Sequence, residues 1–214
     1  MNIILVLVPL IATMFGVMYY YNSREFTELL LAQPIRRTDI FLGQFLGVAF
    51  SLSLSLLIGV GLPFLWYGIF TSIAIFNFLT LIVVGVFLSF IFSAIAFFIA
   101  LKNENRIKGF GLAILTWLFF AVVYDGLFLL LLAMFSDYPL ENFAIGASMF
   151  NPIDLSRILI LLKLDISALM GYTGAVFNQF LGNYVGLLTA FALLITWIII
   201  PTFAIKVVAA KKDF

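Results

Sequence analysis

Asp125 is the residue whose setting points most directly to chemistry, because it is the one charged side chain in the apolar run from Phe110 to Phe135. Counting back from the outer end of that run places the carboxyl roughly 15 Å deep in a bilayer, where an ionised Asp costs about 2.5–3.5 kcal/mol. Three interpretations stay open. Tyr124 and Asp125 line a translocation path, or Asp125 is a structural acid hydrogen-bonded to Tyr124 or a neighbouring helix, or Asp125 and Gly126 mark a break in the span.

Other kinds of chemistry are excluded by residue type. The chain contains neither Cys nor His, so disulfides, Cys and His metal sites, Cys nucleophiles and His-based acid–base catalysis are ruled out. It also has no Gly-rich phosphate loop followed by Lys and Ser or Thr, so it does not hydrolyse ATP itself. We therefore expect no catalytic residue, no metal site and no cofactor bound by this chain. The net charge of +1 makes nucleic acid a poor partner.

The elements that must position Asp125 are membrane helices. Hydrophobic residues make up 65% of the chain, charged residues 10%, and the mean hydropathy is +1.25, whereas an ordinary soluble domain is roughly a quarter charged. The expected fold is therefore an all-α, multi-pass integral membrane protein surrounded by lipid. No linker, repeat or change of composition divides the sequence, so residues 1–214 are expected to form a single transmembrane domain.

Five apolar runs are long enough to span a bilayer at roughly 20 residues each. The uncharged run from Ile40 to Leu101 would be about 93 Å long as one helix, so it must fold back. Pro63 and the polar and aromatic residues up to Asn77 are typical of the turn. The expected spans are residues 1–21, 40–62, 78–101, 110–135 and 184–205, with an external segment at 136–183.

The distribution of Lys and Arg predicts the orientation. With the N-terminus outside, nine of the chain's eleven cations are cytoplasmic, and a reversed chain would invert this bias. The nine are Arg24, Arg36, Arg37, Lys102, Arg106, Lys108, Lys206, Lys211 and Lys212, and the two outside are Arg157 and Lys163. The C-terminus is therefore expected in the cytoplasm. No charged segment precedes the first span to carry an outside N-terminus across, which indicates that an earlier span is missing.

A charged, amphipathic segment, residues 22–39, lies between the first two expected spans. Asn22 and Glu25 have the spacing of a capping box, with Asn in place of Ser or Thr. Pro34 is expected to stop the helix that begins there. The sequence therefore predicts a short helix at about residues 23–33.

One face of this short helix is apolar. Phe26, Leu29 and Leu30 follow the i, i+3, i+4 spacing, whereas Arg24 and Glu28 lie on other sides. We interpret the apolar face as a docking surface on the cytoplasmic side. The alternative is a connector that rests among lipid headgroups.

The span expected at 40–62 carries small residues at every fourth position. Such a stripe lets another helix approach closely, because helices in lipid associate through backbone proximity and dispersion rather than through a hydrophobic drive. We expect an intimate helix contact there, either within the chain or between chains. The members of this small-residue stripe are Gly43, Gly47, Ser51, Ser55 and Gly59.

The external segment contains a helix start. Asn151 has the properties of an N-cap, Pro152 suits the first helical position, and Asp154 suits the first turn. Arg157 lies three residues after Asp154, and the opposite side is apolar. The apolar side consists of Leu155, Ile158, Leu159 and Leu162. This helix is expected to lie in the outer interface or to dip partway into the bilayer, and a second short helix is expected at about residues 175–181.

Two motifs resemble a known family. REFTELLLAQPIRR followed by FLGQFLG resembles the first cytoplasmic loop of type-2 ABC transporter permeases, and NPIDLSRILILLKLDISALMGYTGA resembles the outer segment of the NosY branch, the permeases of nitrous-oxide reductase copper-site maturation. The spacer formed by Phe26 alone is shorter than the family's usual one. The residues that match the first pattern are Arg24, Glu25, Thr27, Leu29, Leu30, Leu31, Pro34 and Arg37, and those that match the second are Asn151, Pro152, Asp154 and Arg157.

The resemblance implies a permease of the bacterial inner membrane that works as a homodimer with two copies of a cytoplasmic ABC ATPase, which binds the ATP and Mg. It also implies a periplasmic NosD-like partner and a copper or sulfur species as cargo. The short helix would be the coupling helix, with Phe26, Glu28 and Arg36 adding to the ATPase contact. Asn151, Pro152, Asp154 and Arg157 would form an external gate or partner-docking surface.

Two other classes of function remain open on the sequence. A membrane scaffold or assembly protein would bind another span through the small-residue stripe and would not respond to a cytoplasmic ATPase. A proton-coupled secondary carrier or a membrane-embedded enzyme would need ionisable residues inside the membrane. Asp125 gives thin support for that class, since no second acid, His or base accompanies it.

Overall fold

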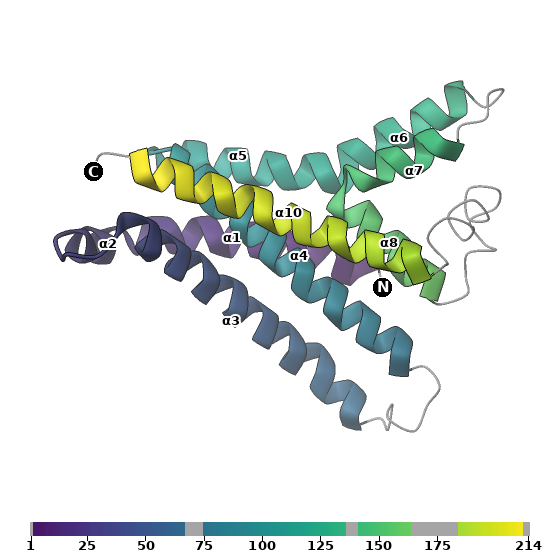
Figure 1. Cartoon of the computed structure of the whole chain (residues 1–214), viewed down its shortest axis with the longest axis horizontal. Coiled ribbons are helices and arrows are strands. Elements are labelled where there is room, and N and C mark those ends of the chain that lie inside the picture. Colours follow the sequence, from purple (N-terminus) through teal and green to yellow (C-terminus); the bar gives the residue numbers. More distant parts are fainter. Residues whose placement is uncertain (1, 67–74, 136–140, 164–183, 212–214) are drawn as a thin grey trace.

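The computed structural model describes residues 2–66, 75–135, 141–163 and 184–211, and in this part of the chain every regular element is a helix (Figure 1). Five helical segments are long and apolar enough to cross a membrane. They are α1 (Asn2–Asn22), α3 (Arg37–Trp66), α4 (Ile75–Lys102), the continuous series α5 (Arg106–Leu118), η2 (Phe119–Val123) and α6 (Tyr124–Met134), and α10 (Tyr184–Lys211). The shorter helices are α2 (Arg24–Leu31), α7 (Glu141–Met149) and α8 (Pro152–Lys163). The expected all-α membrane fold with five candidate spans is confirmed.

The bundle has two ends of different character. Figure 1 shows α2, the start of α5 and the end of α10 at one end, and the start of α1 with α7 and α8 toward the other. The described cations of the expected cytoplasmic set all belong to elements at the α2 end, which we call the cation-rich end. They are Arg24, Arg36, Arg37, Lys102, Arg106, Lys108, Lys206 and Lys211. The fold therefore agrees with the charge pattern, and the orientation in a membrane stays a prediction.

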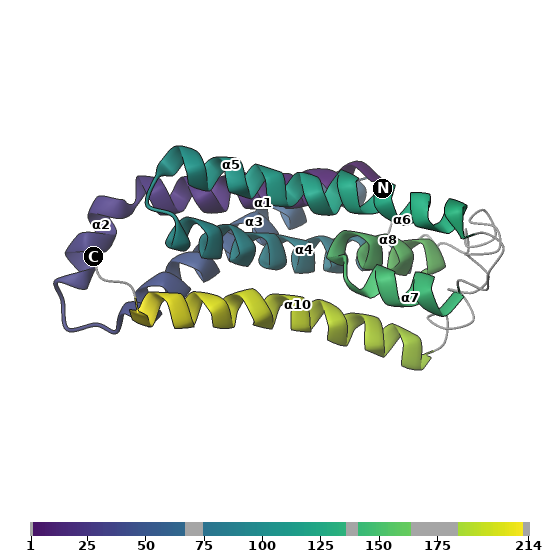
Figure 2. The ribbon, with the colours of Figure 1, turned by 90° about the horizontal axis from the view of Figure 1, so that it is seen from above.

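Helix α4 forms the centre of the bundle. It packs against α1, α3, α5, α8 and α10, and Figure 2 shows it running between α1 and α10. Leu88, Ile91, Phe92 and Phe97 of α4 are fully buried. A helix that is apolar on all sides is expected in a protein core or in a membrane, and α4, whose single charged residue is Lys102 at its end, is compatible with this central place.

Helices α1 and α4 cross at small residues. A Cβ atom built on Gly16 would lie 2.8 Å from the Cβ of Ala96 and 3.6 Å from the carbonyl oxygen of Ser93. A side chain at position 16 would therefore force the two helices apart. This crossing is the kind of close backbone approach that small residues permit between membrane helices.

The turn expected at Pro63 to Asn77 lies where α3 ends and α4 begins, whereas the break left open at Asp125 and Gly126 is not found. Helix α3 continues through Pro63 and ends at Trp66, since a proline this near a helix end removes one hydrogen bond of the last turns without preventing them from forming. Asp125 and Gly126 lie inside the unbroken α6. The irregular turn of this span is instead the π-helix η2, which comes directly before Tyr124.

The small-residue stripe of α3 is exposed, although its member Ser55 borders a cavity shared with α1 and α4. A Cβ atom built on any of its three glycines meets nothing within 4 Å. A contact of this stripe with another described helix of the same chain is therefore wrong. A contact between chains stays a prediction.

Gly109→Ala is expected to disturb the packing of Tyr21 at the cation-rich end. The Tyr21 hydroxyl donates a hydrogen bond to the carbonyl oxygen of Asn103 at 2.7 Å, and a Cβ at position 109 would overlap that hydroxyl and lie 2.8 Å from its Cζ. Overpacking of this kind costs about 1–3 kcal/mol, which a thermal melt in detergent would show. Gly111→Ala, in open space on the same helix, is the control, and equal melting of the two variants would contradict this packing.

Candidate functional site

Helix α2 presents apolar side chains at the cation-rich end of the bundle. Phe26 is 57% exposed and Leu29 is 68% exposed, while Leu30 is half-buried. We call these three side chains the coupling face. On another side of the helix, Arg24 Nε lies 3.1 Å from Glu28 Oε1 in an exposed ion pair. Large apolar side chains left exposed beside polar ones indicate a surface for another molecule.

The capping box predicted for the start of α2 is wrong. Asn22 is the last residue of α1, and Ser23 alone separates the two helices. The Ser23 hydroxyl donates to the carbonyl oxygen of Tyr19 at 2.8 Å rather than capping α2. Backbone hydrogen bonds of 2.9 Å run from Ser23 N to Tyr19 O and from Thr27 N to Ser23 O. Asn22 lies inside α1, and the backbone of Ser23 is bonded to both helices, so Asn22 is not placed to cap α2.

The other residues expected to contact an ATPase lie on or just after α2. Pro34 follows the last residue of the helix, in agreement with its expected role as a stop. The exposed members of this group are Glu25, Pro34, Arg36 and Arg37, whereas Leu31 is half-buried. Thr27 was also expected in this surface, but it is buried, so a direct contact of Thr27 with an ATPase is wrong.

Sequence reasoning missed Gln44, which lies in α3 and contacts α2. Its Nε2 donates a hydrogen bond to Thr27 Oγ1 at 2.7 Å, and both side chains are buried. The only signal available was a lone amide in the first turns of an otherwise apolar span. That signal does not identify a partner.

A polar cluster lies where α8 meets the span formed by α5, η2 and α6. Arg157 Nη1 donates to Asp125 Oδ2 at 2.7 Å and lies 3.1 Å from Asp154 Oδ1. One nitrogen therefore bridges an acid of the span and an acid of its own helix. The three side chains are partly or largely buried, so solvent ions screen the pairs little. The structure supports Asp125 as a structural acid bonded to a neighbouring helix, and its part in a translocation path stays a prediction.

Asn151 joins the cluster to the π-helix. Its Nδ2 donates to the carbonyl oxygen of Phe120 and to Asp154 Oδ2, both at 2.8 Å, and its Oδ1 accepts from the backbone N–H of Ile153 at 3.0 Å. Phe120 belongs to η2, whose wider turn departs from the regular bonding of an α-helix, as is frequent at functional sites. The predicted helix start at Asn151 and Pro152 is confirmed. We call Asp125, Asn151, Asp154 and Arg157 the outer polar cluster.

The burial of this helix start bears on the docking role expected for its residues. Asn151, Pro152 and Asp154 are buried, so they present no surface for an external partner to contact, and the docking role expected for them is wrong. Arg157 is partly exposed. A role of these residues in an external gate stays a prediction.

Helices α7 and α8 form a bent pair. Their axes differ by 115°, and together they have the length and apolarity of a broken span or a re-entrant segment. Helix α8 packs against α1, α4 and α10, and Ser156 is buried together with Ile153, Leu155, Ile158, Leu159 and Ile160. The bent pair agrees with a helix that dips partway into the bilayer, and the choice between this place and the outer interface stays a prediction. Helix α7 was not predicted, and the helix expected at 175–181 lies outside the described residues.

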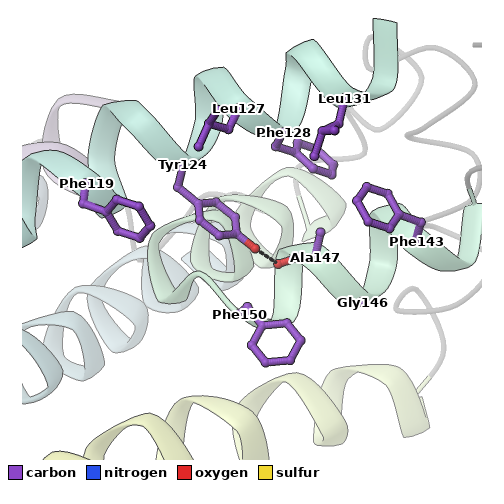
Figure 3. A pocket seen from close by; sticks show the side chains of 9 residues that line it. All are labelled: Phe119, Tyr124, Leu127, Phe128, Leu131, Phe143, Gly146, Ala147 and Phe150. Carbon is purple, nitrogen blue, oxygen red and sulfur yellow. Dashed lines mark hydrogen bonds between the residues drawn. The ribbon is translucent and has the colours of Figure 1, made fainter. Parts of the chain in front are cut away.

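An apolar cavity of about 490 Å³ lies between the η2–α6 segment and α7 (Figure 3). The Tyr124 hydroxyl donates to the carbonyl oxygen of Ala147 at 2.6 Å, so the one polar side chain of the lining is already satisfied. Asp125 does not line the cavity, and among the described residues no group of His, Cys, Asp or Glu could hold a metal ion. The lining residues are Phe119, Tyr124, Leu127, Phe128, Leu131, Phe143, Gly146, Ala147 and Phe150.

Named relatives support the reading of the two motifs. The chain is 30% identical over 151 residues to the "Probable ABC transporter permease protein NosY" of Stutzerimonas stutzeri, which covers 68% of the chain and 51% of the relative. It is 27% identical over 172 residues to the protein of the same name from Pseudomonas aeruginosa, which covers 77% of the chain and 62% of the relative. The chain thus spans about half to three-fifths of the length of these relatives. No protein-family profile matches it.

Fold and similarity lead to the same class of protein. The two relatives are named as permeases, and the five apolar helices give the chain the multi-pass architecture that a permease needs. The chain is a NosY-like integral membrane protein, similar to ABC transporter permeases over 68–77% of its length.

Proposed function

We propose that the chain is the non-catalytic, membrane-spanning permease subunit of an ABC transporter, in which a separate cytoplasmic ATPase drives the movement of a substrate. The observation that best supports this proposal is the exposed coupling face of α2 at the cation-rich end. Lys and Arg gather on the cytoplasmic side of membrane proteins, so this face would meet a cytoplasmic partner. The membrane is the bacterial inner membrane, and ATP and Mg bind to the partner.

The proposed mechanism is a rigid-body movement. When the ATPase closes on ATP, it presses on Phe26 and Leu29, and α2 passes the displacement to the spans on either side of it. Helix α2 follows α1 after the single residue Ser23, so the two helices move together. A shift of α1 and α3 against the rest of the bundle opens or closes the outer end.

The outer polar cluster is the proposed external gate. Arg157 and Asn151 tie α8 to Asp125 and to the carbonyl of Phe120, so the bent pair α7–α8 and the outer half of the neighbouring span move as one body. The NosY likeness extends the proposal to maturation of the copper site of nitrous-oxide reductase, with a copper or sulfur species as cargo. Two ATPase copies, a second copy of this chain and a periplasmic NosD-like protein complete the proposed assembly.

Leu29→Glu tests the coupling face. A carboxylate placed in an apolar contact loses its hydration without gaining a partner, and loss of a central interface residue weakens binding by about 2 kcal/mol or more. We therefore expect the affinity for the ATPase to fall about 30-fold or more, so that far less ATPase copurifies with the chain in mild detergent. The measurement is the amount of ATPase per chain by quantitative mass spectrometry, together with ATP hydrolysis by the purified sample.

Leu29→Met is the matched control, because it keeps the apolar surface and the length of the side chain. It is expected to retain the ATPase. Full retention by Leu29→Glu would contradict the coupling face. A chain that purifies without any ATPase would instead favour the scaffold function, which the exposed small-residue stripe of α3 would serve.

A further inference from the structure

The two ends of α2 are attached to their spans in different ways. Toward α1 only Ser23 intervenes, whose N–H donates to the carbonyl oxygen of Tyr19 in α1 and whose carbonyl oxygen accepts from Thr27 N in α2. Toward α3 residues 32–36 intervene, and among them Pro34 has no N–H group to donate. The α1 junction is therefore stiff, whereas the connection to α3 is a turn that absorbs displacement.

A side-chain hydrogen bond bypasses this turn. Thr27 is the one buried residue of α2, all of whose residues are described, and it is 5% exposed. Gln44 in α3 is 7% exposed. Gln44 Nε2 donates to Thr27 Oγ1 at 2.7 Å, and the Thr27 hydroxyl donates to the carbonyl oxygen of Ser23 at 2.8 Å. A chain of hydrogen bonds thus runs from the α1–α2 junction through α2 into α3.

The direction of these bonds is fixed by their chemistry. The Thr27 hydroxyl has a single hydrogen, which goes to Ser23, so toward Gln44 it can only accept, and the amide must turn its N–H to Thr27. Gln44 Oε1 is buried and has no hydrogen-bond partner among the described residues. A buried acceptor without a partner lowers stability, and a Leu at this position would avoid that penalty. The bond to Thr27 is therefore what the amide contributes here.

We propose that the hydrogen bond between Thr27 and Gln44 is the joint that carries displacement of α2 into α3, with Gln44 as a positioning residue for coupling. This inference rests on the proposed function. A hydrogen bond is directional and resists sliding as well as separation, whereas an apolar contact is not directional. Without the joint, α2 still moves with α1, the turn at 32–36 takes up the motion, and α3 stays in place.

The test uses the complex of the chain with its copurified ATPase. Spin labels are attached to Trp66→Cys on α3 and Val185→Cys on α10, which are exposed positions in a chain without native cysteine. Pulsed electron paramagnetic resonance measures the distance between the labels with and without ATP and vanadate. The otherwise unaltered chain is expected to show a nucleotide-dependent shift. Thr27→Val and Gln44→Leu are each expected to lose the shift while the ATPase stays bound.

A double variant separates coupling from stability. In Thr27→Val with Gln44→Leu both partners are apolar and no polar atom of the pair is left buried alone, so its melting temperature is expected to exceed that of either single variant. The shift is still expected to be lost. Thr27→Ser keeps the hydroxyl and is expected to keep the shift. Ser53→Ala is the matched control, since Ser53 is also buried in α3 but donates within its own helix to Ala49 O.

Three results would overturn the inference. A normal shift in the double variant would show that the bond is only structural, and the proposed function would stand. A lost shift in Ser53→Ala would show that any buried change in α3 has the same effect. If the unaltered chain shows no nucleotide-dependent shift, the proposed role of the Thr27–Gln44 hydrogen bond is contradicted. If the unaltered chain also binds no ATPase, the proposed function is contradicted as well.

Discussion

Arg157→Leu is expected to destabilise the folded chain by about 3–5 kcal/mol, because it breaks a buried charge network by removing its cation. Arg157 Nη1 lies 2.7 Å from Asp125 Oδ2 and 3.1 Å from Asp154 Oδ1. Its loss leaves two carboxylates close together with little water around them. At roughly 2–4 °C per kcal/mol for a chain of this size, the melting temperature is expected to fall by about 6–20 °C. A thermal melt followed by tryptophan fluorescence in detergent measures it.

Two further variants show whether the charge is responsible. Arg157→Lys keeps a cation that can reach both acids from a single nitrogen, although it lacks the planar fork of Arg, so most of the stability is expected to return. Arg157→Leu combined with Asp125→Asn removes one of the two unpaired carboxylates and is expected to melt above Arg157→Leu alone. Melting of Arg157→Leu together with the unaltered chain would contradict the ion pairs of the outer polar cluster.

The cluster matters for α6 because this helix has little else to hold it. None of its residues, all of which are described, is buried. Bonds from Asp125 to Arg157 and from Tyr124 to the carbonyl of Ala147 join it to the bent pair α7–α8. Membrane helices gain little from apolar contact with each other relative to lipid. The polar bonds therefore add to the packing of the partly buried Phe128 and Leu132 against the core in holding the outer half of this span.

The span architecture could be predicted from the sequence because the thickness of a bilayer demands about 20 apolar residues per crossing. The sequence does not show which of these spans are buried inside the bundle and which are exposed. Helices α1 and α3 are similarly apolar, yet Leu5 and Val17 of α1 are fully buried whereas Phe50 and Leu54 of α3 are exposed. Apolarity shows that a helix avoids water, but it does not distinguish lipid from another helix as its surroundings.

Part of the candidate site could also be predicted. Asn151, Asp154 and Arg157 belong together on one helix by their spacing, and Asp125 needs a partner because an isolated charge is unfavourable in the membrane. The bond between Asp125 and Arg157 joins positions 32 residues apart, and no helical periodicity pairs them. The charges of Asp154 and Arg157 are typical of a surface helix. Helix α8 is nevertheless buried, because Arg157 pairs with both Asp154 and Asp125.

Small residues illustrate the same limit. The stripe of α3 is regular in the sequence but is exposed in the structure, while the close crossing occurs at Gly16 and Ala96, each of which has only one small residue at the same spacing, Ala12 and Ala100. Spacing shows where another helix could approach, not whether one does. The homodimer of the proposed function would supply a helix for the stripe of α3.

Gly47→Leu is expected to weaken association of two copies of the chain about 5- to 150-fold, which corresponds to about 1–3 kcal/mol for overpacking a close contact. The monomer is expected to melt unchanged, since a Cβ at Gly47 meets nothing within 4 Å. Energy transfer between labelled copies in lipid vesicles, followed on dilution with lipid, measures the association. Gly111→Leu makes the same change at an exposed, open position of α5 and is expected to leave association intact. Undiminished association of Gly47→Leu would mean that the stripe faces lipid and that any dimer forms elsewhere.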